Sequence, residues 1–275
     1  MLFRSNRILQ IPDADRAKGV VAFSSGNHAQ GVAAVAGILG IPATIVMPAD
    51  APRAKIEGTK ALGAQVVTYD RTTGDREAIA AEIVARTGAT LVKPFDDADI
   101  VAGQGTVGLE IARAAEAMGV ALDAVLVPCS GGGLVTGIAL ALSQVSPATR
   151  VFSVEPEGFD GMRQSHDKGE RLTVKTGALS IADALMSPFP GHVPFALAKL
   201  HLAGGLAVDD DALRRAVSFA FRRIKVVAEP GGTAALAAVL SGAFDAKGKN
   251  VALVISGGNA DPETVSDCCA RFLTP

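Results

Sequence analysis

The sequence predicts an α/β fold with two parallel-sheet domains. Short runs rich in Val and Ile alternate with longer Ala-rich segments, and Gly or Pro stands at the joins. Strands and helices that alternate in this way form right-handed crossovers onto parallel sheets. The runs are too many for one sheet of ordinary size. Buried strands are predicted over residues 20–23, 43–47, 65–69, 90–93, 124–127, 150–154 and 250–255.

Helices are predicted between these strands, and one acidic, glycine-containing stretch separates the two halves of the chain. Residues 94–105 (PFDDADIVAGQG) lack helical periodicity, so a domain boundary is predicted there, with a cleft between the domains. The predicted helices cover residues 27–39, 52–62, 75–87, 105–118, 133–143, 210–223, 231–241 and 262–272.

Composition excludes several classes of protein. The 275 residues are 49% hydrophobic and 20% charged, with a net charge of -2, which predicts a large core and no attraction to nucleic acid or an anionic membrane. Three cysteines are an odd number without metal-ligand spacing, so a cytoplasmic setting is expected. No apolar stretch is long and continuous enough for a signal peptide or a membrane span.

Ligands of parallel α/β sheets bind beyond the carboxyl ends of strands, and the first candidate loop follows the strand at 20–23. Small hydroxyl residues and Gly at a helix start present donors to an anion such as a carboxylate. An ordinary helix N-cap is the alternative interpretation. The loop consists of Ser24, Ser25, Gly26, Asn27 and His28.

The second candidate loop follows the strand at 124–127 and consists of Ser130, Gly131, Gly132 and Gly133. Consecutive glycines cost backbone entropy, and a phosphate needs unobstructed amides at a helix N-terminus. A nicotinamide dinucleotide is the rival ligand, because Glu155 lies where an acidic ribose ligand is expected. Thr136, however, stands where the third fingerprint glycine should be, which favours a single phosphate.

Two further loops carry weaker signals. Ser256 follows the strand at 250–255, where its hydroxyl could bind a ring nitrogen or simply end the strand. Glu229 precedes Pro230 and Gly231, a combination that also caps helices.

Taken in order, these loops and their neighbours resemble the pyridoxal-phosphate enzymes of the threonine/serine dehydratase and serine racemase family. The resemblance covers nearly the whole chain. It implies a tryptophan-synthase-β-like fold (fold type II), in which a small α/β domain is inserted into a larger one. The matching segments are VVAFSSGNHAQGVA (20–33), AGQGTVGLEI (102–111), VPCSGGGLVTGIA (127–139), VEPEGFD (154–160), EPGGTAAL (229–236) and ISGGN (255–259).

The resemblance also assigns roles around pyridoxal 5'-phosphate. Asn27 would bind the cofactor's 3-hydroxyl, and Ser256 would face the pyridine nitrogen. Ser25 would exchange a proton at the substrate Cα. The phosphate would lie on Ser130, Gly131, Gly132 and Gly133, and the amino-acid substrate on Ser24, Ser25, Gly26, His28 and Glu229.

One departure concerns the lysine that forms the Schiff base in the family. It lies in an S-F-K-x-R-G-like segment upstream of the 24–28 loop, but here Leu2 falls at its position, and Lys93 is the only other lysine near a candidate site. The first elements of the large domain are therefore expected to be missing. The implied domains are 1–15 (a remnant of the large domain), 16–96 (small) and 97–275 (large, cofactor-binding).

A second departure concerns the divalent cation that many relatives bind. Glu155 matches one ligand and the carbonyl of Phe159 another, but Gly161 stands where an acidic ligand is expected. Asp160 is one residue away from that position. Two ligands do not make a site for a hard cation.

The expected function is an ammonia-lyase that converts L-threonine to 2-oxobutanoate, or L-serine to pyruvate, in a homo-oligomer. Without the lysine, catalysis by this chain is not expected. The alternatives are a non-catalytic relative that binds the cofactor or an amino acid, a serine racemase-like activity and, least favoured, a nicotinamide-dependent oxidoreductase.

Overall fold

The computed structural model consists of two compact units, Met1–Gly103 (unit 1) and Gln104–Pro275 (unit 2). It describes residues 2–24, 26–51, 53–70, 72–175 and 179–272. Each unit has a four-stranded parallel sheet with helices on both faces, so the predicted α/β class is confirmed.

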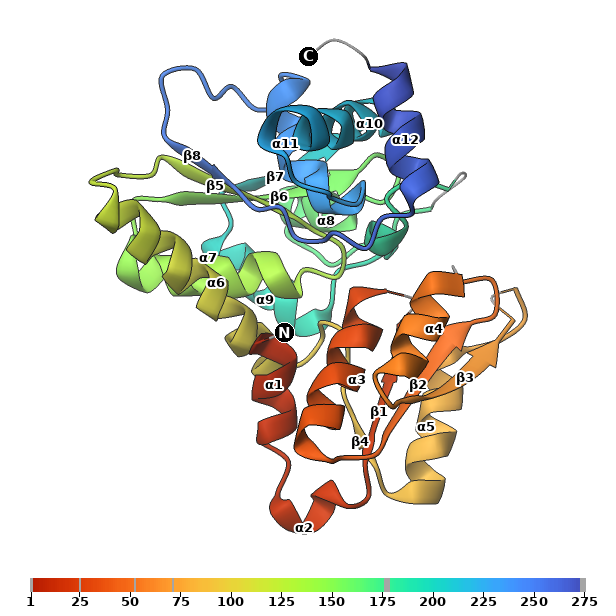
Figure 1. Ribbon diagram of the computed structural model, residues 1–275. Coiled ribbons are helices and arrows are strands. Elements are labelled where there is room, and N and C mark those ends of the chain that lie inside the picture. Colours follow the sequence, from red (N-terminus) through yellow and green to blue (C-terminus); the bar gives the residue numbers. More distant parts are fainter. Residues whose placement is uncertain (1, 25, 52, 71, 176–178, 273–275) are drawn as a thin grey trace. The chain divides into compact units, whose positions relative to one another are not determined.

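Unit 1 has the strand order β3-β2-β1-β4 (Figure 1). All four residues of β1 are buried, as expected for a strand that is covered on both faces. Helices α1, α3 and α4 share a core on one face, and α5 packs against the other. The strands are β1 (Val20–Phe23), β2 (Ala43–Pro48), β3 (Gln65–Tyr69) and β4 (Thr90–Leu91), and the helices are α1 (Leu2–Leu9), α2 (Asp13–Arg16), α3 (Asn27–Leu39), α4 (Arg53–Ala61) and α5 (Arg76–Thr87).

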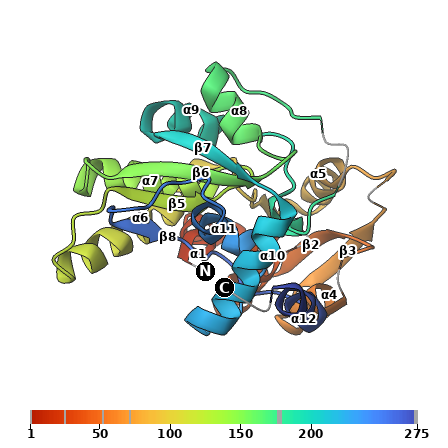
Figure 2. The same cartoon turned by 90° about the horizontal axis from the view of Figure 1, so that it is seen from above.

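Unit 2 has the strand order β7-β6-β5-β8. Figures 1 and 2 show α7 and α9 on one face of this sheet and α10 and α11 on the other, with a separate apolar core on each face. The strands are β5 (Ala124–Pro128), β6 (Arg150–Pro156), β7 (Gly204–Val208) and β8 (Val251–Leu253); the helices are α6 (Ala98–Ala117), α7 (Gly133–Val145), α8 (Gly161–Lys168), α9 (His192–His201), α10 (Asp210–Phe219), α11 (Ala234–Leu240) and α12 (Pro262–Arg271). Shorter turns cover Asp183–Leu185, Ala220–Ile224 and Gly231–Thr233.

The stretch at 94–105, predicted to lie between elements, contains the start of helix α6. Asp97 accepts hydrogen bonds from the amides of Asp99 (2.8 Å) and Ile100 (3.2 Å), so its carboxylate caps the helix. The acidic residues that suggested a linker are thus a helix start. The boundary between the two units falls within α6, and the predicted domain bounds 1–15, 16–96 and 97–275 stay a prediction.

Sequence patterns did not reveal β7, α8, α9 or α1, for physical reasons that differ. β7 opens with two glycines, α8 (GMRQSHDK) is mostly polar, and α9 carries Pro194 in its first turn. Helix α1, interpreted as a frayed remnant, begins at Leu2 and packs against α3 through the fully buried Ile8.

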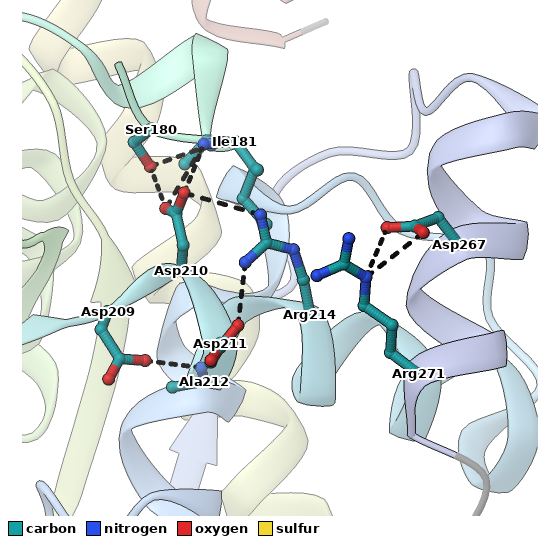
Figure 3. Close-up of polar contacts among 10 residues, drawn as sticks. Ser180, Ile181, Asp209, Asp210, Asp211, Ala212, Arg214, Asp267 and Arg271 are labelled. Carbon is teal, nitrogen blue, oxygen red and sulfur yellow. Dashed lines mark hydrogen bonds and ion pairs between the residues drawn. The ribbon is translucent and has the colours of Figure 1, made fainter. Parts of the chain in front are cut away.

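Ion pairs and caps fix the start of α10 (Figure 3). Asp209 accepts a hydrogen bond from the Ala212 amide (2.7 Å). Asp210 reaches out of its helix and accepts hydrogen bonds from the Ser180 hydroxyl (2.6 Å) and the Ile181 amide (3.2 Å). The Asp210 carboxylate therefore ties the 180–182 segment to α10.

Asp210→Ala is expected to lower the free energy of unfolding by about 1–3 kcal/mol, because it leaves the amide and hydroxyl donors of the 180–182 segment without this acceptor. Urea denaturation followed by circular dichroism measures the change. Asp211→Ala is the matched control, since its exposed ion pair with Arg214 (2.9 Å) is worth less than about 1 kcal/mol. Equal losses in the two variants would contradict this role of Asp210.

Candidate functional site

The glycine loop (residues 130–133) joins β5 to α7, as predicted. Gly132 precedes the helix with φ +96°, a left-handed conformation that favours glycine, and its carbonyl accepts hydrogen bonds from Thr136 N (3.0 Å) and Oγ1 (2.8 Å). The first amides of a helix have no intrahelical acceptor. The loop therefore offers the start of α7 to an anion.

The segment 187–194 supports the glycine loop from outside it. The Ser187 amide donates to Ser130 Oγ (3.3 Å), and the Gly191 amide donates to the Gly131 carbonyl (2.9 Å). A Cβ atom on Gly132 would lie 2.9 Å from Pro194 Cβ. Sequence reasoning missed this support; the only signal was the proline- and glycine-rich run PFPGHVP.

The loop that carries Ser256 leaves the strand next to β5. β8 pairs with β5 in parallel register, Leu126 opposite Leu253, so Ser256 and the glycine loop lie beyond the carboxyl ends of neighbouring strands. Ser256 is exposed, and its amide donates to the Gly232 carbonyl (3.2 Å). The sequence-predicted residues Ser130 and Ser256 thus belong to the same edge of the sheet.

Glu229 belongs to this edge as well. Its amide donates to the Gly257 carbonyl (3.1 Å), and its side chain is buried. A Cβ on Gly232 would lie 2.6 Å from the Gly257 oxygen, so the loops 229–233 and 256–258 meet backbone to backbone. Glycine at 232 is required by this close approach.

In unit 1, the 24–28 loop joins β1 to α3. Ser24 Oγ accepts a hydrogen bond from the Gly26 amide (3.2 Å), Gly26 precedes the helix and Asn27 begins it. Ser25 lies outside the described residues. The loop adopts the strand-to-helix arrangement that the sequence predicted.

His28 contacts the end of β4. Its ring is buried, and Nε2 lies 3.0 Å from the Val92 carbonyl, which can only accept, so Nε2 carries the hydrogen. This nitrogen is occupied within unit 1. Lys93, the lysine beside Val92, is exposed.

Glu155, expected as a metal ligand, lies in β6 and is completely buried. Its carboxylate accepts hydrogen bonds from the amides of Met162 (2.9 Å) and Arg163 (2.7 Å) at the start of α8. Burial raises the pKa of Glu155 to about 8, although the two amides act in the opposite direction. Burial also raises the pKa of the Cys129 thiol, and the charge of Glu155 adds to that effect.

Within the described part of the chain, no three His, Cys, Asp or Glu side chains are grouped as a metal site would require. Helices long and apolar enough to cross a membrane are likewise not found there.

Comparisons with known proteins agree with these loops. The family described as "Pyridoxal-phosphate dependent enzyme" matches residues 4–257. L-threo-3-hydroxyaspartate ammonia-lyase of Saccharomyces cerevisiae is 41% identical over 93% of this chain and 77% of its own length. L-threonine ammonia-lyase of Thermotoga maritima is 42% identical over 93% of this chain, which covers 62% of that protein.

Solved structures of relatives share the fold. A threonine deaminase whose source is given as T.th. superposes with a TM-score of 0.87 at 41% identity, over 94% of this chain and 82% of that one. Maize serine racemase gives 0.88 at 34% identity, over 98% and 82%. The chain therefore belongs to the pyridoxal-phosphate-dependent enzyme family, in the group that contains threonine ammonia-lyases and serine racemases.

Proposed function

We propose that this protein is built for ammonia-lyase chemistry on a small 3-hydroxy-amino acid, L-threonine or L-serine. The observation that carries the proposal is the edge of the unit 2 sheet, where a glycine loop and a neutral hydroxyl, Ser256, leave neighbouring strands. The amides of the glycine loop fit a phosphate at a helix N-terminus. When bound, pyridoxal phosphate would supply the electron sink for the substrate Cα.

Ser256 favours elimination over transamination. A hydroxyl carries no charge, so it stabilises a protonated pyridine ring less than a carboxylate would, and full electron withdrawal into the ring is limited. The exposed position of Ser256 leaves its side chain accessible to a ligand.

The 24–28 loop is proposed to bind the substrate carboxylate, with Asn27 on the cofactor's 3-hydroxyl. Because His28 Nε2 is hydrogen-bonded to Val92, the contribution of His28 comes from its backbone amide in the first turn of α3. Glu229, Ser24, Ser25 and Gly26 keep the substrate-binding roles implied by the resemblance.

Serine racemisation is a second candidate, because the relatives include the serine racemase of Schizosaccharomyces pombe, 42% identical over 94% of this chain. Both reactions begin with removal of the Cα proton. A non-catalytic relative that binds the cofactor or an amino acid is the third candidate, since the family lysine has no counterpart in the chain. A homo-oligomer in the cytoplasm remains the expected setting.

The test is an assay of products. The chain, joined at its N-terminus to the lysine-containing segment of the Thermotoga maritima relative, is expected to release 2-oxobutanoate from L-threonine or pyruvate from L-serine. D-serine as the main product would favour the racemase. No product from either amino acid, with cofactor bound, would leave the non-catalytic relative.

Ser256→Ala is expected to weaken binding of pyridoxamine 5'-phosphate about fivefold, because one hydrogen bond to the ring, worth roughly 1 kcal/mol, is lost. Isothermal titration calorimetry measures the dissociation constant. Ser241→Ala, at another exposed serine, is the matched control and should bind like the parent. An unchanged affinity in Ser256→Ala would show that the pyridine-nitrogen role is wrong.

A further inference from the structure

The end of β6 carries the residues that the resemblance assigns to a divalent cation, and their surroundings can be compared with what such an ion needs. A hard cation takes six or more oxygen ligands, several of them carboxylates or waters. The candidate donors here are the carboxylate of Glu155 and the carbonyl of Phe159. The decisive question is what already occupies these oxygens.

Both oxygens of Glu155 are engaged by backbone amides. Oε1 accepts from Met162 N (2.9 Å) and Oε2 from Arg163 N (2.7 Å), within the first turn of α8. The positive end of the helix dipole lies on this carboxylate, where it repels a second positive charge. The anion thus has a partner of the kind a cation would otherwise provide.

Asp160, the nearest other carboxylate, is also occupied. It is buried and accepts hydrogen bonds from the Arg163 guanidinium and from Gln164 Nε2 (3.0 Å). An arginine side chain therefore neutralises the second acid of the segment.

Gly161 leaves no room for the missing acidic ligand. A Cβ on Gly161 would lie 3.1 Å from the Pro188 carbonyl oxygen and 3.4 Å from Phe189 Cα. The 188–189 backbone occupies the space into which an aspartate side chain would project. The residues present do not fit a divalent cation.

The same carboxylate is connected to the glycine loop through Met162. Met162 is completely buried in the core that contains Val135 and Ile138 of α7. A Cβ on Gly132 would overlap Met162 Cε, so this methyl group lies directly beneath the loop. Displacement of the first turn of α8 would remove that support.

We propose that Glu155 is a positioning residue that holds the start of α8 under the glycine loop in place of a divalent cation, so that this protein binds the cofactor phosphate without a metal. The phosphate part of the inference rests on the proposed function. The metal part rests only on the contacts of Glu155, Asp160 and Gly161.

The metal part is tested on the unaltered chain after treatment with EDTA. Unfolding is followed by circular dichroism with MgCl₂, CaCl₂ or MnCl₂, against NaCl of equal ionic strength. The midpoint is expected to stay within about 1 °C, since only a ligand that binds the native state raises it. A saturable rise of several degrees with any of these cations would overturn the inference.

The phosphate part is tested by calorimetric titration with pyridoxamine 5'-phosphate, which needs no lysine. Glu155→Ala is expected to bind at least tenfold more weakly than the parent, and Glu157→Ala, an exposed acid in the same segment, is expected to bind like it. The affinity of the parent should not change between EDTA and magnesium. Equal affinities of Glu155→Ala and the parent, or a tenfold dependence on magnesium, would overturn the inference.

Two further arms keep these outcomes distinguishable. If Glu155→Ala does not fold, Met162→Ala replaces it, with the same expected loss of affinity because the atom beneath Gly132 is removed. If the parent binds no pyridoxamine 5'-phosphate, the proposed function and the phosphate part fail together, while the cation titration still decides the metal part.

Discussion

The 275-residue chain is expected to form 2-oxobutanoate from L-threonine at least about 10³-fold more slowly than the same chain joined to a lysine-containing N-terminal segment. A positioned general base contributes about 10²–10⁴ to a rate, and in this family the lysine is both the base and the covalent anchor. No lysine of the chain stands in a matching sequence context. The rates are compared by a coupled assay of 2-oxoacid release.

The control is the same extended chain with the added lysine replaced by alanine, which should be as slow as the 275-residue chain. Comparable rates from the 275-residue chain and the lysine-containing version would contradict the prediction. Another lysine would then serve, and two would be mutated first: the exposed Lys93 and Lys55, which is buried in the first turn of α4.

Gly132→Ala is expected to lower the free energy of unfolding by about 2–5 kcal/mol and to abolish detectable binding of pyridoxamine 5'-phosphate. The left-handed conformation costs about 1–2 kcal/mol for a residue with a Cβ, and overpacking adds about 1–3 kcal/mol. The added atom would overlap Met162 Cε and crowd Pro194. A side chain at 132 thus acts by displacing the loop from beneath.

Gly119→Ala is the matched control, because Gly119 also has a positive φ (+67°) but has open space around its Cβ position. It should lose only about 1–2 kcal/mol and keep the affinity of the parent. Urea denaturation and calorimetry measure both quantities. Equal losses of stability in the two variants would contradict the crowding beneath the loop.

The loops of the candidate site were accessible to sequence reasoning because local chemistry determines them. Residues 130–133 and 24–28 each lie between a run of buried apolar residues and a helix, and glycine or a small hydroxyl residue is needed there in any fold. The partners of these loops were not accessible. Ser187 and Gly191 are far from Ser130 in sequence, and nothing local marks them as its neighbours.

The start of α6 and the role of Glu155 show the same limit. Asp97 is an acidic residue in a polar stretch, and only its contacts with Asp99 and Ile100 distinguish a helix cap from a linker. Glu155 matched a metal ligand in residue type, whereas its contacts with α8 depend on tertiary packing. Long-range packing, which no local pattern encodes, decided both cases.

The most direct test of the account is whether binding to this chain depends on the phosphate group. Calorimetric titration with pyridoxamine 5'-phosphate and with pyridoxamine, which lacks the phosphate, compares the two ligands on the same protein. The account predicts that the phosphorylated ligand binds at least 100-fold more tightly, about 2.7 kcal/mol, because the glycine loop provides the anchor. Equal affinities for the two ligands would contradict the assignment of residues 130–133 as the phosphate site.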